Sequence, residues 1–266
     1  MQLRSFRAPV CILAAALMAA AVPAAQQSAG GDFSWRGMVA PGGELEIKGV
    51  NGDVTAEAST SGEAEVVAVM RAQRSDPRQV RVELVQHARG VTFCAVYPSR
   101  NSDKPNECAP GDQGRMNVQN NDVSVTFTVR VPPGVSFVGR TVNGDVAARS
   151  LNGPVSLKTV NGSATFSTSS HGEASTVNGS VQGTLGTSDW TGELEFKTVN
   201  GSVTLDLPAD LSADVRAATV NGDIATDFPL TVSGRFSSRR LQGTIGAGGR
   251  TLALETVNGS IKLRRR

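Results

Sequence analysis

The fold is decided by a six-residue phrase, Thr141-Val142-Asn143-Gly144-Asp145-Val146, that returns along the second half of the chain. Further copies read Thr-Val-Asn-Gly-(Asp/Ser)-(Val/Ala/Ile) at residues 159–164, 176–181, 198–203, 219–224 and 256–261. A degenerate copy, Leu241-Gln242-Gly243-Thr244-Ile245, fills the one long gap. Counted from the asparagine or its glutamine substitute, the steps are 18, 17, 22, 21, 21 and 16 residues. Self-similarity at a period of about 20 residues indicates a repeat architecture.

Asn-Gly is a strong turn signal, and here short β-prone runs flank it. One such run is Glu193-Leu194-Glu195-Phe196-Lys197, which alternates apolar and polar residues as a half-buried strand does. Each period therefore holds about two short strands and two bends, which bury their apolar sides only when stacked. We expect an all-β, single-stranded β-solenoid with about 17–22 residues per coil and an elaborated N-terminal β region. An up-and-down sandwich with Asn-Gly hairpins is the rival, but it gives no reason for the constant phase of the phrase.

Stacking of the coils predicts columns of identical residues. The valines of the phrase are expected in one interior column. The asparagines are expected at one corner, where their amides can bond along the stack as in cross-β assemblies. A row of ligand-binding amides is the alternative interpretation of the same residues. The six predicted ladder positions are Asn143, Asn161, Asn178, Asn200, Asn221 and Asn258.

The N-terminus has the features of a secretory signal peptide. Basic residues Arg4 and Arg7 precede an apolar run at residues 8–21 and small residues up to Ala25. We therefore expect cleavage near residue 25, export to the periplasm or the medium, and no transmembrane segment in the mature chain. An uncleaved membrane anchor is the alternative, although the run is shorter than the roughly 20 residues that span a bilayer. Without Arg4 and Arg7 the chain keeps 24 basic and 24 acidic residues, which argues against nucleic acid as a partner.

Two cysteines, Cys94 and Cys108, remain in the predicted mature chain. In an oxidising compartment such a pair is expected to form a disulfide. The alternatives are a redox site or a metal site. The sequence has no Cys-x-x-Cys motif and only two histidines, so neither a metal nor a cofactor is expected.

The repeat begins near the mature N-terminus, because Gly43-Glu44-Leu45-Glu46-Ile47-Lys48-Gly49-Val50-Asn51-Gly52-Asp53-Val54 closely matches residues 192–203. The region that follows this first copy also has β character, with strands expected at residues 65–71, 80–85 and 122–131. We therefore divide the chain into a signal peptide (1–25), an N-terminal β region with the disulfide loop (26–135) and the repeat solenoid (136–266).

Three features are candidates for a binding surface. Residues 98–119 form a long Pro/Asn/Gly-rich loop, and such loops often carry function. Trp35 and Trp190, together with Tyr97, could contact sugars if their rings are exposed, although packing at coil edges is the alternative. The terminal Arg264-Arg265-Arg266 could touch anionic lipid or polysaccharide, or its charge could protect the edge of the last coil against end-to-end stacking.

An enzymatic role is the main alternative to binding. Asp53, Asp145 and Asp223 follow Asn-Gly in their copies and could converge at one corner, as carboxylates do in polysaccharide-processing β-helices. Other copies carry serine there, which favours ordinary turn chemistry. The sequence also lacks a Gly-x-Ser-x-Gly elbow, a His-Glu-x-x-His motif and a phosphate-binding loop.

The repeated phrase, the exported context and the ending Gly259-Ser260-Ile261-Lys262-Leu263 resemble the bacterial "putative adhesin" family of β-strand repeat proteins, a domain of unknown function. The resemblance implies a β-solenoid in an envelope or extracellular setting and provides no catalytic residues. We therefore expect a non-enzymatic binding and scaffolding module, with an envelope polysaccharide or another envelope protein as its partner. The alternative is a polysaccharide lyase or hydrolase.

Overall fold

The structure is a computed structural model that describes residues 26–27, 31–99, 101, 103–232, 237 and 239–266. The predicted signal peptide, residues 1–25, lies outside the described residues. Two long β-sheets and a short 3-10 helix, η1 (Pro77–Gln79), make up the regular structure of the described chain. Within these residues no helix has the length and apolar character needed to cross a membrane.

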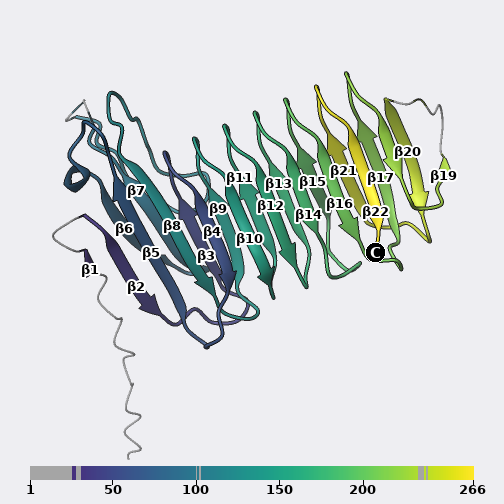
Figure 1. The fold of residues 1–266 in the computed structure, drawn as a ribbon. Coiled ribbons are helices and arrows are strands. Elements are labelled where there is room, and N and C mark those ends of the chain that lie inside the picture. Colours follow the sequence, from purple (N-terminus) through teal and green to yellow (C-terminus); the bar gives the residue numbers. More distant parts are fainter. Residues whose placement is uncertain (1–25, 28–30, 100, 102, 233–236, 238) are drawn as a thin grey trace, which may run out of the picture.

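Over the described ranges each sheet contains eleven strands, and the two sheets lie face to face (Figure 1). In spatial order the first sheet contains β1 (Gln26–Gln27), β2 (Phe33–Gly37), β5 (Ala64–Arg71), β8 (Ser124–Val131), β4 (Val54–Ala58), β10 (Val146–Leu151), β12 (Ala164–Thr168), β14 (Val181–Thr184), β16 (Val203–Leu207), β22 (Ile261–Arg265) and β18 (Ile224–Thr226). The second contains β19 (Thr231–Val232), β20 (Arg240–Ile245), β17 (Ala213–Ala218), β21 (Thr251–Glu255), β15 (Glu193–Lys197), β13 (Gly172–Ser175), β11 (Val155–Lys158), β9 (Ser136–Arg140), β3 (Glu44–Lys48), β7 (Gly90–Val96) and β6 (Arg81–His87).

Each coil gives one strand to each sheet and lies parallel to its neighbours, which confirms the predicted β-solenoid. The coils follow one another in space as β7/β8, β3/β4, β9/β10, β11/β12, β13/β14, β15/β16, β21/β22 and β17/β18. Antiparallel strands add to both ends of the stack, β5 and β6 at one end and β20 at the other. Both sheets continue across residue 135, the boundary drawn between the N-terminal β region and the repeat solenoid. Strand β9 pairs with β3, and β10 pairs with β4.

One continuous hydrophobic core fills the space between the sheets, from Phe33 to Leu263. Alternate residues of most strands point into it, so β8 has the burial pattern of a strand with one face inside. Phe166 and Phe196 stack within the core with ring centroids 6.2 Å apart.

The phrase itself forms one corner of each coil that carries it, with its threonine inside and its valine outside. Thr198 is 3% exposed, whereas Val199 is 38% exposed. The predicted interior valine column is therefore wrong. The alternation of β15 explains the correction, because Phe196 points inward and the next inward position is Thr198. Each buried hydroxyl donates to the carbonyl of a glycine in the adjacent coil, as Thr176 Oγ1 does to Gly162 O at 2.7 Å.

A second column, of aspartates and serines, also bonds along the corner. The Asp145 carboxylate accepts the backbone N–H of Ser163 at 2.7 Å, and Ser163 Oγ accepts the N–H of Ser180 at 3.3 Å. Each side chain thus satisfies a backbone donor of the next coil. Asp and Ser can therefore replace each other at this position, because each provides a side-chain oxygen that accepts the backbone N–H of the adjacent coil.

The corner requires glycine because successive turns lie in close contact. Gly162 has φ +153°, and a Cβ atom there would lie 2.0 Å from the carbonyl oxygen of Gly144. A side chain would therefore separate the coils.

Two expectations about the end of the chain are wrong. Gln242 lies within β20, opposite Arg216 of the antiparallel strand β17, so the degenerate copy forms no corner. The C-terminal arginines do not protect the edge of the stack, because β22 is paired on both sides, with β16 and with β18. Arg264 instead forms an ion pair with Asp206 of β16 at 2.7 Å.

Candidate binding groove at the head of the asparagine ladder

The asparagines of the phrase form one continuous ladder along the corner. In each step the amide nitrogen of one coil donates to the amide oxygen of the coil before it in the stack, at 2.8 Å. The order in space is Asn51, Asn143, Asn161, Asn178, Asn200, Asn258 and Asn221. The six predicted positions therefore share one row, and Asn51 of the first copy begins it.

Valines accompany the ladder, and five of the seven are exposed, while Val50 and Val257 are half-buried. Val142, Val160, Val177 and Val199 are 38–39% exposed, and Val220 is 55% exposed. Each amide has two N–H groups and, apart from Asn51, which only accepts, uses one of them in the ladder. The corner therefore presents a straight row of methyl groups and amides spaced by about 4.8 Å, the distance between strands. We call this row the corner stripe.

A loop, residues 97–123, turns the first two steps of the stripe into a groove of about 600 Å³. The corner provides Val50, Asn51, Val142 and Asn143 to its lining. The loop provides Met116, Asn117, Val118, Asn120 and Asn121. Amides and apolar groups thus line both sides. Glu107 and Arg115 bring opposite charges to the same groove.

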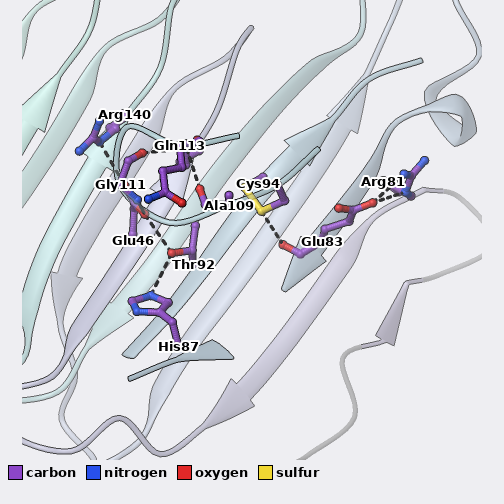
Figure 2. Close-up of a disulfide and its surroundings, with 12 residues drawn as sticks. Glu46, Arg81, Glu83, His87, Thr92, Cys94, Ala109, Gly111, Gln113 and Arg140 are labelled. Carbon is purple, nitrogen blue, oxygen red and sulfur yellow. Dashed lines mark hydrogen bonds and ion pairs between the residues drawn. A yellow bond between two sulfur atoms is a disulfide. The ribbon is translucent and has the colours of Figure 1, made fainter. Parts of the chain in front are cut away.

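A disulfide fastens the base of this loop (Figure 2). Cys94 of β7 and Cys108 are bonded with their Cα atoms 5.6 Å apart. Both sulfur atoms are buried against Val96 and Met116. The bond therefore holds the loop against the outer face of the second sheet.

Lys48 of β3 provides a second fastening. Its ammonium donates to the backbone carbonyls of Ala109, Gly111 and Gln113, which Figure 2 labels, at 2.8, 2.9 and 2.7 Å. Burial lowers the pKa of Lys48, while the nearby Glu46 carboxylate opposes the shift. Because all three N–H donors are occupied, this ammonium holds the loop in place and is not available to an anionic ligand.

A buried carboxylate completes the attachment. Glu46 is 1% exposed, and its Oε2 accepts the Thr92 hydroxyl and the Gly111 N–H, each at 2.9 Å. Arg140 Nε forms an ion pair with Glu46 Oε1 at 3.1 Å, and the Arg140 guanidinium also binds Asp112. Hydrogen bonding to Arg140 holds the pKa of Asp112 below its usual value. Glu46, Lys48, Arg140 and Asp112 together carry no net charge.

The aromatic residues predicted to contact sugars lie inside the protein. Trp35, Trp190 and Tyr97 are 3%, 4% and 1% exposed. Their rings belong to the core, so they form no stacking surface. Tyr97 instead holds the far end of the loop, because its hydroxyl donates to Val123 O at 2.8 Å.

The three aspartates considered for catalysis do not meet. Asp53 and Asp145 occupy adjacent coils and bond to each other through a backbone N–H. Asp223 lies at the other end of the stripe, beyond the serine-bearing coils. Among the described residues no cluster of three or more His, Cys, Asp or Glu side chains is placed to hold a metal.

Comparison with known proteins identifies the family. The fold is similar to a "putative cell adhesion protein" from Clostridium sporogenes ATCC 15579, with TM-score 0.46, 11% identity, and coverage of 88% of this chain and 99% of that chain. It is also similar to a "putative adhesin" from Bacteroides fragilis NCTC 9343, with TM-score 0.36, 11% identity, and coverage of 87% and 96%. A search of the curated proteins finds no match. The Toastrack DUF4097 family matches residues 21–264, nearly the whole sequence, so the chain belongs to this family of unknown function.

Proposed function

We propose that this chain is an exported, non-enzymatic binding and scaffolding module that holds an extended, uncharged polymer, an envelope polysaccharide, along its corner stripe. The observation that carries the proposal is that the groove opens directly onto the stripe. Val142 and Asn143 belong to both. A linear polymer held in the groove can therefore continue along the following coils.

The chemistry of the lining supports an uncharged ligand rich in hydroxyl or amide groups. Side-chain amides both donate and accept hydrogen bonds, so they match hydroxyl groups without requiring charge. Valine and methionine methyl groups can contact the C–H faces of sugar rings. The charges beneath the loop are paired with each other and leave little field to attract an ionic polymer.

The setting outside the cell rests on two features. Residues 1–25 have the pattern of a signal peptide. The Cys94–Cys108 disulfide fits an oxidising compartment. The solenoid fits scaffolding because its repeated face can hold a long partner at many equivalent points.

The test is a titration of residues 26–266 with neutral β-linked glucose and N-acetylglucosamine oligomers of increasing length, followed by product analysis of the same mixtures. We expect saturable binding that tightens with length, because longer oligomers reach more coils of the stripe. A polyuronate of equal length is expected to bind more weakly. Cleavage of any oligomer would overturn the non-enzymatic role. Binding of an envelope protein without any glycan would overturn the ligand class.

A matched pair of variants locates the site. Val177→Asp places a charge in the stripe and is expected to weaken binding of long oligomers about tenfold, or 1.4 kcal/mol. Thr165→Asp places the same charge on the exposed outer face of β12 and is expected to leave binding unchanged. If both variants change the affinity for long oligomers equally, the binding site does not lie on the corner stripe.

A further inference from the structure

The last coil of the chain does not occupy the last place in the stack. From β9 to β16 the coils follow one another in chain order. The coil formed by β21 and β22 instead lies between β15/β16 and β17/β18, with parallel pairing on both sides. Figure 1 shows it as the yellow pair between green strands. We call residues 251–265 the inserted coil and the gap between its two neighbours the slot.

The bonds that hold the inserted coil are those that join every other pair of coils. Asn258 donates its amide N–H to Asn200 and accepts one from Asn221, each at 2.8 Å. Thr256 Oγ1 donates to the Gly201 carbonyl, and Thr219 Oγ1 donates to the Gly259 carbonyl, each at 2.8 Å. The slot therefore recognises the repeat phrase itself. The inserted coil also brings its own apolar residues into the core, namely Leu252, Leu254, Ile261 and Leu263.

A short glycine-rich segment connects the inserted coil to the preceding strand. Residues 246–250 cross from β20 to β21, and β17 lies between these two strands. Gly246, Gly248 and Gly249 have φ of +58°, +71° and +99°. Such a segment can change its path at low conformational cost, because glycine adopts both signs of φ readily. The coil can thus leave the slot by a change confined to this hinge.

An identical slot exists in every copy of the chain, and it offers the same donors, acceptors and apolar contacts. We propose that the inserted coil is exchanged between two copies, so that residues 251–265 of each chain fill the slot of the other. The exchange replaces each contact by its equivalent, as in domain-swapped dimers. It would join two corner stripes in one molecule, which would raise the avidity for a long polymer.

Two variants, each with one cysteine added to the native Cys94–Cys108 pair, test the exchange directly. Ser260 N lies 3.2 Å from Ser202 Oγ, so the two residues face each other in adjacent coils. We would refold differently tagged Ser202→Cys and Ser260→Cys chains together at high protein concentration, oxidise them and separate them without reducing agent. The two added cysteines of different chains face each other in adjacent coils when one chain fills the slot of the other, whereas chance oxidation at the surface would also link the control pair described next. We expect a mixed dimer that increases with the protein concentration during refolding.

The matched control uses two coils that adjoin in chain order. Ser163 and Ser180 face each other in the same way, with Ser180 N to Ser163 Oγ at 3.3 Å. The mixture of Ser163→Cys and Ser180→Cys chains is expected to give no mixed dimer. A Ser202→Cys/Ser260→Cys double variant that closes its disulfide within one chain, with no mixed dimer from the single variants, would overturn the proposal. Sedimentation of the unmodified chain after the same refolding gives an independent result, and a monomer at every concentration would also overturn it.

Discussion

The coils between β9 and β16 and the end of the stack that carries the disulfide loop share two sheets and one core, but different contacts stabilise them. The regular coils repeat three weak bonds at every corner, through Thr, Asn and Asp or Ser. The loop end uses contacts that occur once, such as the disulfide and the Lys48 ammonium. The repeated bonds make the corner stripe straight, with every coil equivalent to the next. The contacts that occur once fix the loop over one end of the stripe, which therefore differs from the rest. The groove lies where the two regions meet.

The largest effect is expected from a side chain at a regular corner. In Gly162→Ala the new Cβ would lie 2.0 Å from Gly144 O at a φ of +153°. Backbone strain and overpacking each cost about 1–3 kcal/mol, so the free energy of unfolding should fall by about 3 kcal/mol or more. Urea unfolding of residues 26–266 measures it. Gly62→Ala is the control, because nothing lies within 4 Å of its Cβ position. Similar stabilities for the two variants would show that the corner tolerates separation of the coils.

Loss of the disulfide tests the loop end. Cys94 and Cys108 are 14 residues apart, and a loop of that size corresponds to about 3 kcal/mol in the chain-entropy account. The double variant Cys94→Ala/Cys108→Ala should unfold at lower urea and be cleaved by proteases within residues 97–123. A loss below about 1 kcal/mol, with the loop still protected, would mean that Lys48 and Tyr97 fasten the loop without the disulfide.

High pH should act on the loop end through the only tyrosine of the chain. Burial raises the pKa of Tyr97 to about 12. The unfolded chain, with a tyrosine pKa of about 10, loses this proton first as the pH rises. Stability from Tyr97 is therefore complete below pH 10 and falls between about pH 10 and 12, by up to about 1.4 kcal/mol per pH unit.

The tyrosinate absorbance of the folded protein, which reports this residue alone, should rise with a midpoint near 12. Tyr97→Phe should remove the corresponding part of the pH dependence of unfolding. A folded-state midpoint near 10 would contradict the buried position of the phenol.

The smallest effect is expected from one bond of the periodic set. Thr176→Val removes one buried hydroxyl, which donates to Gly162 O at 2.7 Å and lies 3.5 Å from Val160 O, and keeps the shape of the side chain. The free energy of unfolding should fall by about 1 kcal/mol. Thr165→Val, on the exposed face of β12, is the matched control and should change stability by less than about 0.5 kcal/mol. If both variants lower the free energy of unfolding equally, the threonine hydroxyls do not stabilise the corner, and backbone hydrogen bonds alone hold the coils together there.

Parts of the site follow from sequence, and others do not. The spacing of Asn143, Asn161 and Asn178 predicts that they stack, because the period of the phrase equals one coil. The outward position of Val199 could also be predicted from the sequence. Inward positions alternate along the strand, so after Phe196 the next one is Thr198, and Val199 points outward. The burial of Trp35 follows the same alternation, because Phe33 and Trp35 are inward positions of β2. The burial of Trp190 was not present in the sequence, because a lone aromatic residue in a connecting segment carries no periodic signal.

No local sequence pattern predicts the contacts that shape the groove. Lys48 reaches carbonyl groups more than 60 residues away in the chain, and nothing in the loop sequence indicates that a lysine will be there. Glu46 likewise finds Thr92 and Gly111 only after three separate segments are in place. Such contacts depend on how segments pack together.

The sequence by itself determined the coil, its length and the corner ladder, because these depend on turn chemistry and on a period that neighbouring residues express. Only the tertiary structure decided the order of the coils, the groove and the place of Asn221 at the end of the ladder. The physical reason is that every corner offers the same hydrogen-bonding groups to its neighbours. Asn200 can bond to Asn258 as well as to Asn221, so local chemistry does not choose between them. The packing of the whole stack, with β20 covering β17, places the last coil of the chain inside.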